Sequence, residues 1–199
     1  MSRSLSPIRV RALLVSLLVA LSGSLALQPA AAGAAPAPNQ TQFSVDLLVS
    51  LGMTAGGVKL TPIAPATQGL GGLYFPVTSS SASGAFTGTV KHSGGFQLQY
   101  GNLKIGFRNP TINVRPGTPA RGWLSAEPVV NGIVVPFQFP ISEVSVTSAR
   151  STGGLVLGKT KVVIDRNIVA LVNSVIGVNI LKVDQPWATT ETRVAASAG

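Results

Sequence analysis

His92 is the only histidine in the chain and the residue best suited to acid-base chemistry. It lies in the stretch KHSGGFQLQYGNLKIGF, directly before Ser93. A nucleophilic serine needs an imidazole base within hydrogen-bond reach and a third group that orients this base. Ser93 is a poor partner, because neighbouring residues of a strand point to opposite faces. The sequence also contains no G-x-S-x-G turn, which would expose a reactive serine. We therefore expect no serine hydrolase.

The acidic residues indicate neither a metal site nor a catalytic pair of carboxylates. They are spread singly along the chain, as Asp46, Glu127, Glu143, Asp165, Asp184 and Glu191. A metal site usually needs several histidine, cysteine or carboxylate ligands at close spacing, and this chain has one histidine and no cysteine. The paired glycines do not form a phosphate-binding pattern before a helix. The sequence thus predicts a non-catalytic protein without a metal.

Positive charge is the remaining feature that could bind a ligand. Five bases and no acid occur from Lys91 to Arg121. Lys104 and Arg108 fall on the polar side of one predicted strand, so we predict an anion-binding patch there. The alternative is a solvated strand face on which Lys104 prevents edge-to-edge pairing.

The alternation of apolar and polar residues predicts that His92 belongs to a β-sheet. Gly101-Asn102 is expected to form a two-residue turn, with Phe96 opposite Phe107 on the apolar side. A slip of one residue would bury Lys104, so the pattern fixes the register. Asn131-Gly132 predicts a second hairpin of the same kind.

From Phe43 onward, runs rich in Val, Ile and Thr are separated by turn residues about every eight to twelve positions, which is typical of antiparallel sandwiches and barrels. Further strands are predicted at 73–77, 85–91, 111–114, 141–147, 155–164 and 187–194. The predicted fold class is mainly β, an antiparallel sandwich or flattened barrel with two short helices.

Each predicted helix combines an aspartate, an apolar segment with helical spacing and a glycine. In the second, Asp165 can cap the first turn and Gly177 can close the helix. Its predicted apolar face consists of Ile168, Leu171, Val172 and Val175. Asp46 and Gly52 predict a shorter helix of the same kind. The similarity of the two segments indicates either a weak internal repeat or two independent strand-helix-strand connections.

The first residues have the three-part layout of a secretory signal. Arginines precede an apolar run at 12–27, which is shorter than the ~20 residues that cross a bilayer, and small residues follow at 30–32. We predict a signal peptide at 1–32, a Pro/Ala-rich linker at 33–42 and a β-rich domain at 43–195. No transmembrane anchor is expected after signal removal. The expected location is the cell envelope or the secreted fraction.

Removal of the signal peptide would take away three arginines and no acid, leaving 12 of the 15 bases against 6 acids. This balance favours an envelope polymer, an anionic lipid or a small anionic or apolar ligand as partner. Nucleic acid is not expected outside the cell. The alternative is that the charge only keeps the protein soluble.

The segment FTGTVKHSGGFQLQYGNLKIGFRNPTINV resembles the central signature of the haem-transport-associated (Htaa) domains of exported actinobacterial proteins. The matching positions are Gly88, Val90, His92, Gly94 or Gly95, Phe96 or Leu98, and Pro110. The preceding LYFPV fits as well, and the resemblance covers residues 71–117.

This resemblance implies an alternative function, the binding of haem or another porphyrin. In haem-binding members an early tyrosine is the iron ligand, and a histidine that His92 matches supports it. The early segment here, NQTQFSVDLLVSLG, has no tyrosine. Tyr74 and Tyr100 are the only phenols, and a haem site is assigned to His92 and Tyr100. Our main expectation is that no cofactor is bound and that His92 satisfies backbone groups at a Gly-Gly bulge.

Overall fold

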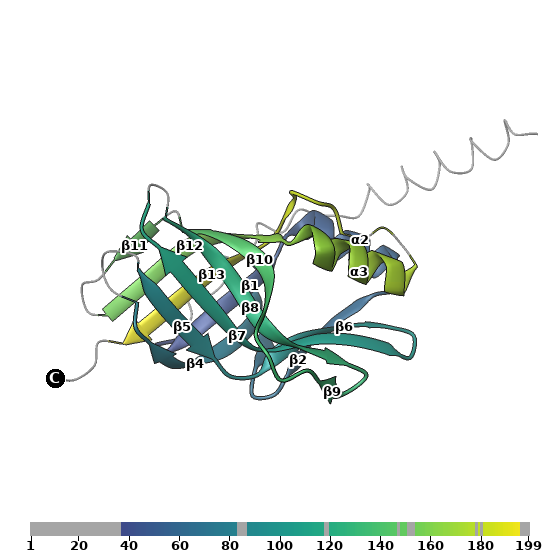
Figure 1. Ribbon diagram of the computed structural model, residues 1–199, viewed down its shortest axis with the longest axis horizontal. Coiled ribbons are helices and arrows are strands. Elements are labelled where there is room, and N and C mark those ends of the chain that lie inside the picture. The colour runs from purple at the N-terminus through teal and green to yellow at the C-terminus, as the bar shows by residue number, and fades with distance from the viewer. Residues whose placement is uncertain are drawn as a thin grey trace, which may run out of the picture. The chain divides into compact units, whose positions relative to one another are not determined.

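The computed structural model describes residues 37–82, 87–117, 120–146, 148–150, 154–177, 179 and 181–195. The expected signal peptide and residues 33–36 of the expected linker lie outside this part of the chain. The described residues form one antiparallel sheet and two helices, which confirms the expected fold class (Figure 1).

The sheet closes on itself as a barrel. Its strands are β1 (Gln40–Val45), β2 (Lys59–Ile63), β3 (Thr67–Gly69), β4 (Gly72–Ser80), β5 (Gly88–His92), β6 (Gly95–Tyr100), β7 (Leu103–Arg115), β8 (Ala120–Val130), β9 (Ile133–Val134), β10 (Phe139–Val146), β11 (Ser148–Arg150), β12 (Gly154–Ile164) and β13 (Pro186–Ala195). The order β7-β5-β4-β1-β13-β12-β10-β8 becomes a ring because β8 also pairs with β7. β6 and β2 extend the sheet beyond β7, and β9 extends it beyond β8.

Both predicted hairpins are confirmed, the first with its predicted register. Phe96 lies opposite Phe107, and the pairing continues to the turn at Gly101. In the second hairpin β8 pairs with β9, and both turn residues have the positive φ that a type I′ turn needs, +48° at Asn131 and +87° at Gly132.

The predicted strand at 111–114 is the second half of β7. Asn109 has a φ of +48°, and the register of β7 on β8 shifts between Arg108 and Thr111. The first half of β7 pairs with β6 and the second half pairs with β5. This bulge therefore separates the extension formed by β6 and β2 from the closed barrel.

The domain begins earlier in the chain than expected. β1 starts at Gln40, and Thr41 and Gln42 are buried between β4 and β13. Residues 40–42, which were expected in the linker, therefore belong to the sheet.

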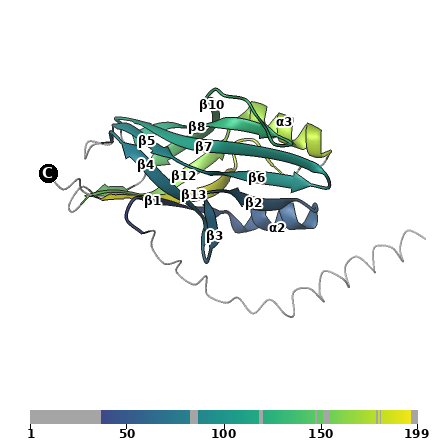
Figure 2. The same ribbon diagram turned by 90° about the horizontal axis from the view of Figure 1, so that it is seen from below.

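The two helices begin at the predicted aspartates. α2 (Leu47–Ala55) is capped by Asp46, whose side chain accepts a hydrogen bond from the backbone N–H of Leu48. α3 (Arg166–Ile176) is capped by Asp165 in the same way, and it ends at Gly177, which is left-handed with a φ of +76°. Both helices lie at the right-hand end of the barrel in the two views (Figures 1 and 2).

Two details of the helix predictions are wrong. Gly52 lies inside α2, which ends at Ala55, and Gly57 takes the left-handed φ of +72°. Leu171 is half exposed on α3, whereas Val169 is buried beside Ile168 and Val172. The buried stripe of α3, which also includes Ile176 in the last turn, is thus rotated around the helix axis relative to the predicted face. The side chain of Val175 lies outside the described residues.

One continuous core fills the barrel and the space under the helices. It contains four aromatic residues from four strands, and the ring of Phe43 stacks on Phe96 and meets Phe75 and Trp187 edge to face. Gly72 allows β4 to approach β1 closely, because a Cβ at this position would lie 2.1 Å from the carbonyl oxygen of Phe43. Neither helix has the length of a membrane-spanning helix.

Candidate functional site

His92 lies inside the barrel and joins strands that are distant in sequence. Its side chain projects from the end of β5 and is almost fully buried. The Nε2 atom is 2.6 Å from the hydroxyl of Thr41 on β1, and that hydroxyl is 2.8 Å from the hydroxyl of Thr192 on β13. The Nδ1 atom is 2.7 Å from the carbonyl oxygen of Pro110 on β7.

These contacts determine the protonation of the ring. The carbonyl of Pro110 can only accept, so Nδ1 carries the proton and donates it. Nε2 then accepts from Thr41, whose oxygen accepts in turn from Thr192. Burial lowers the pKa of His92 from 6.5 to about 4, although the hydrogen bond to Pro110 opposes the shift. His92 is thus neutral at pH 7, and both ring nitrogens are occupied.

The space beside His92 is small compared with a porphyrin. The cavity beside the ring has a volume of about 20 Å³ and is lined mainly by core side chains such as Phe75 and Phe96. The hydrogen-bond partners of His92 are Thr41 and Pro110, whereas the resemblance implies that this histidine supports a tyrosine. Tyr100 lies at the far end of β6, 40% exposed and beside Gly57, and does not line this cavity. The structure therefore does not bring His92 and Tyr100 together.

The glycines after His92 shape the backbone rather than bind a ligand. Gly94 has a φ of +79°, and a Cβ on it would lie 2.4 Å from the backbone nitrogen of Ala66. The partners of the histidine ring are a carbonyl on β7 and a hydroxyl on β1, not backbone groups of the Gly94-Gly95 bend.

Lys104 and Arg108 are on the same side of β7, as predicted, but differ in exposure. Lys104 is exposed next to the turn of the second hairpin, where Asn131 hydrogen-bonds its backbone. Arg108 is partly buried, and its Nε atom is buried without a hydrogen bond in the described part of the chain.

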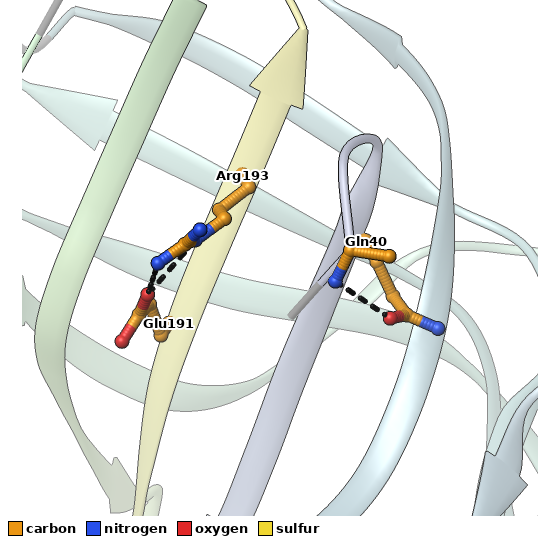
Figure 3. Close-up of polar contacts among 4 residues, drawn as sticks. Gln40, Glu191 and Arg193 are labelled. Carbon is orange, nitrogen blue, oxygen red and sulfur yellow. Dashed lines mark hydrogen bonds and ion pairs between the residues drawn. The ribbon is translucent and has the colours of Figure 1, made fainter. Parts of the chain in front are cut away.

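The other bases are dispersed around the barrel. Arg115 stacks over the ring of Trp123, with its guanidinium carbon 4.5 Å from the ring centroid. Arg115 and Arg121 line a surface groove that Glu143 and Asp165 also line, so the positive charge there is matched. On β13, Arg193 pairs with Glu191 at 3.1 Å, near Gln40 of β1 (Figure 3).

A groove beside α2, which we call the α2 groove, has a volume of about 640 Å³. It is lined by Phe43, Val45, Ser50, Met53, Thr54, Gly57, Val58, Lys59, Leu60, Thr61, Gln68, Gly71, Gly72 and Leu73. Its floor is apolar, because Phe43, Met53, Val58 and Leu73 belong to the core. Lys59 is the charged residue of its lining. Its volume is in the range of pockets that bind small molecules.

Comparison with solved structures shows which known domain the chain resembles. The C-terminal domain of HtaA from Corynebacterium glutamicum superposes with a TM-score of 0.56, covering 77% of this chain and 94% of that domain at 13% identity. The chain has an HtaA-like fold. A domain-swapped dimer of a variant of the same domain gives a TM-score of 0.49 at 12% identity, covering 97% of this chain and 96% of that one. No protein-family model and no curated protein matches the sequence.

The comparison confirms the resemblance to Htaa domains at the level of the fold. The α2 groove, in contrast, was not indicated by the sequence. Its walls come from α2, β2 and the hairpin of β3 and β4, and nothing in the local pattern shows that these elements stand apart.

Proposed function

We propose that this protein is an exported, non-catalytic binding domain whose α2 groove holds the apolar part of an amphipathic anion, such as a long-chain carboxylate. The apolar floor of the groove carries this proposal, because buried apolar surface that faces an opening favours a hydrocarbon chain. Lys59 supplies a cation for the charged end of the ligand. Export is proposed from the signal-like first 32 residues.

A binding role, rather than catalysis, is supported by the state of His92. A general base needs an accessible nitrogen near the substrate, and both nitrogens of His92 are engaged inside the barrel. Among the described residues, no cluster of three or more histidine, cysteine or acidic side chains forms a metal site.

The test is a titration of the chain from residue 33 with a long-chain fatty acid below its micelle concentration. Thr54→Trp places a bulky ring in the groove from an exposed position of α2 and is expected to weaken binding at least tenfold. Ser174→Trp is the matched control, because Ser174 is also an exposed helix residue whose hydroxyl bonds its own helix. Equal affinity in both variants, or no saturable binding, overturns the proposal.

Charge is tested separately with Lys59→Glu. This variant is expected to weaken binding of the fatty acid but not of the uncharged alcohol with the same chain. A loss for both ligands would show that Lys59 acts through packing and not through its charge.

Haem is the alternative ligand, and the geometry around His92 does not support it. We expect that haemin added to the protein gives no Soret shift that depends on His92. A shift in the wild-type protein that disappears in His92→Gln, with the fold retained by circular dichroism, would favour haem instead.

A further inference from the structure

α2 is apolar on both of its faces, although only one face is covered. Its sequence, LLVSLGMTA, has no charged residue. Val49 and Met53 are buried against the core, whereas Leu47, Leu48 and Leu51 are 68%, 70% and 51% exposed. A helix that is apolar all round is normally buried, so the outer face of α2 is expected to have a partner.

The same kind of residue is exposed across the α2 groove. Leu70, at the tip of the hairpin formed by β3 and β4, is 86% exposed. This hairpin and α2 both line the groove, and both lie on the lower side of the sheet in Figure 2. Exposed leucines thus flank the groove on its two sides.

Charge identifies the partner. The described residues contain 12 of the chain's 15 bases and all 6 acids, because only Arg3, Arg9 and Arg11 precede them. A second copy of the chain would carry the same net positive charge, whereas an anionic bilayer attracts it, and Lys59 in the α2 groove places one of these cations beside the helix. Exposed leucines gain free energy by entering the boundary between headgroups and acyl chains, because their apolar surface is then removed from water.

We propose that the outer face of α2, together with Leu70, docks on an anionic lipid bilayer and turns the α2 groove toward the lipid. This inference rests on the proposed function, since it makes the membrane the source of the amphipathic anion. α2 would lie in the plane of the interface without crossing the bilayer.

The test is cosedimentation of the chain from residue 33 with vesicles. This form contains the whole barrel and core, which lie within residues 40–195, and it lacks the apolar leader, which would itself bind lipid. Vesicles of phosphatidylcholine with phosphatidylglycerol are compared with vesicles of phosphatidylcholine alone. The protein is expected to bind the anionic vesicles at least tenfold more strongly.

The decisive variant carries Leu47→Ser, Leu48→Ser and Leu51→Ser. All three side chains are exposed, so the fold should persist, and vesicle binding is expected to fall at least tenfold. The matched control carries Ile133→Ser, Leu171→Ser and Val183→Ser, three exposed apolar residues outside α2. An equal loss in the control, or no loss in the α2 variant, overturns the proposal.

Two further measurements separate the remaining outcomes. If the protein is a dimer in solution and the α2 variant is a monomer, a second copy covers the helix and the lipid proposal is wrong. Binding of the soluble fatty acid should survive in the α2 variant, because the three leucines do not line the groove. If the wild-type protein binds the fatty acid but not the vesicles, the docking proposal alone is rejected. If Thr54→Trp does not weaken fatty-acid binding, the groove proposal is rejected.

Discussion

His92 shows how a residue with catalytic potential can serve the fold. Its hydrogen bonds connect β5 with β7, β1 and β13, and the chain of donors runs from Thr192 through Thr41 to the ring. Each of these polar groups is buried, so each would cost free energy without its partner.

Two neighbouring threonines of β13 should respond differently to the same substitution. Thr192→Val removes the donor to Thr41 and is expected to lower the free energy of unfolding by about 1 kcal/mol. Thr190→Val is expected to be neutral or stabilising, because the hydroxyl of Thr190 is buried and has no hydrogen-bond partner among the described residues. Urea unfolding of both variants checks this, and equal costs would contradict the donor chain.

The stability of the protein should fall between pH 7 and pH 5. The pKa of His92 is about 4 in the folded state and 6.5 when exposed, so below pH 6.5 the unfolded chain binds a proton that the folded one does not. We expect a loss of about 2 kcal/mol by pH 5. Urea unfolding at both pH values measures it.

His92→Asn is the control for this pH dependence. As His92 is the only histidine, the loss should be absent in the variant, which is also expected to be less stable at pH 7. The same loss in the variant would assign it to other groups.

At the scale of elements, local rules predicted some features in detail and failed where two elements meet. The turn residues Gly101-Asn102 and Asn131-Gly132 correctly predicted the positions of both hairpins. The aspartates correctly predicted where both helices begin. The exposed face of α2 could not be predicted, because a leucine that faces solvent has the same sequence signal as one in a core. β1 was partly missed, since Gln40 and Gln42 give no strand signal, and Thr41 and Gln42 are buried only by their neighbours on both sides.

The aspartate caps provide a test at this scale. Asp165→Ala is expected to lower the free energy of unfolding by about 1 kcal/mol, because the backbone N–H of Asn167 loses its acceptor. Asp165→Asn should retain most of the stability, since an amide oxygen can accept the same hydrogen bond. Thermal unfolding of the two variants makes the comparison, and an equal loss in both would point to the charge of Asp165 instead.

At the scale of the whole domain, β1 is what closes the ring between β4 and β13. The alternation of apolar and polar residues predicted most strands of the sheet, and hence a sandwich or barrel. It could not predict the closure itself, because the pairing of β7 with β8 along their length depends on the bulge near Asn109. The site was predicted less well than the fold, because the α2 groove is formed by segments joined only in space.

Truncation tests where the domain begins. A chain starting at residue 37 keeps β1 complete and is expected to fold as the longer form does. A chain starting at residue 43 loses Thr41 and half of β1, so the hydrogen bond to His92 and most pairing with β4 disappear. We expect it to be unfolded or much less stable by circular dichroism, and unchanged melting would show that residues 40–42 are dispensable.

Closure of the barrel by β7 and β8 also affects the tendency of the protein to aggregate at high concentration. The strands left at free margins in the described sheet, β2, β3, β9 and β11, have 5, 3, 2 and 3 residues. Short margins of this kind offer little template for cross-β growth. Because the chain has no cysteine, this resistance to fibril formation would not depend on the redox state of its surroundings.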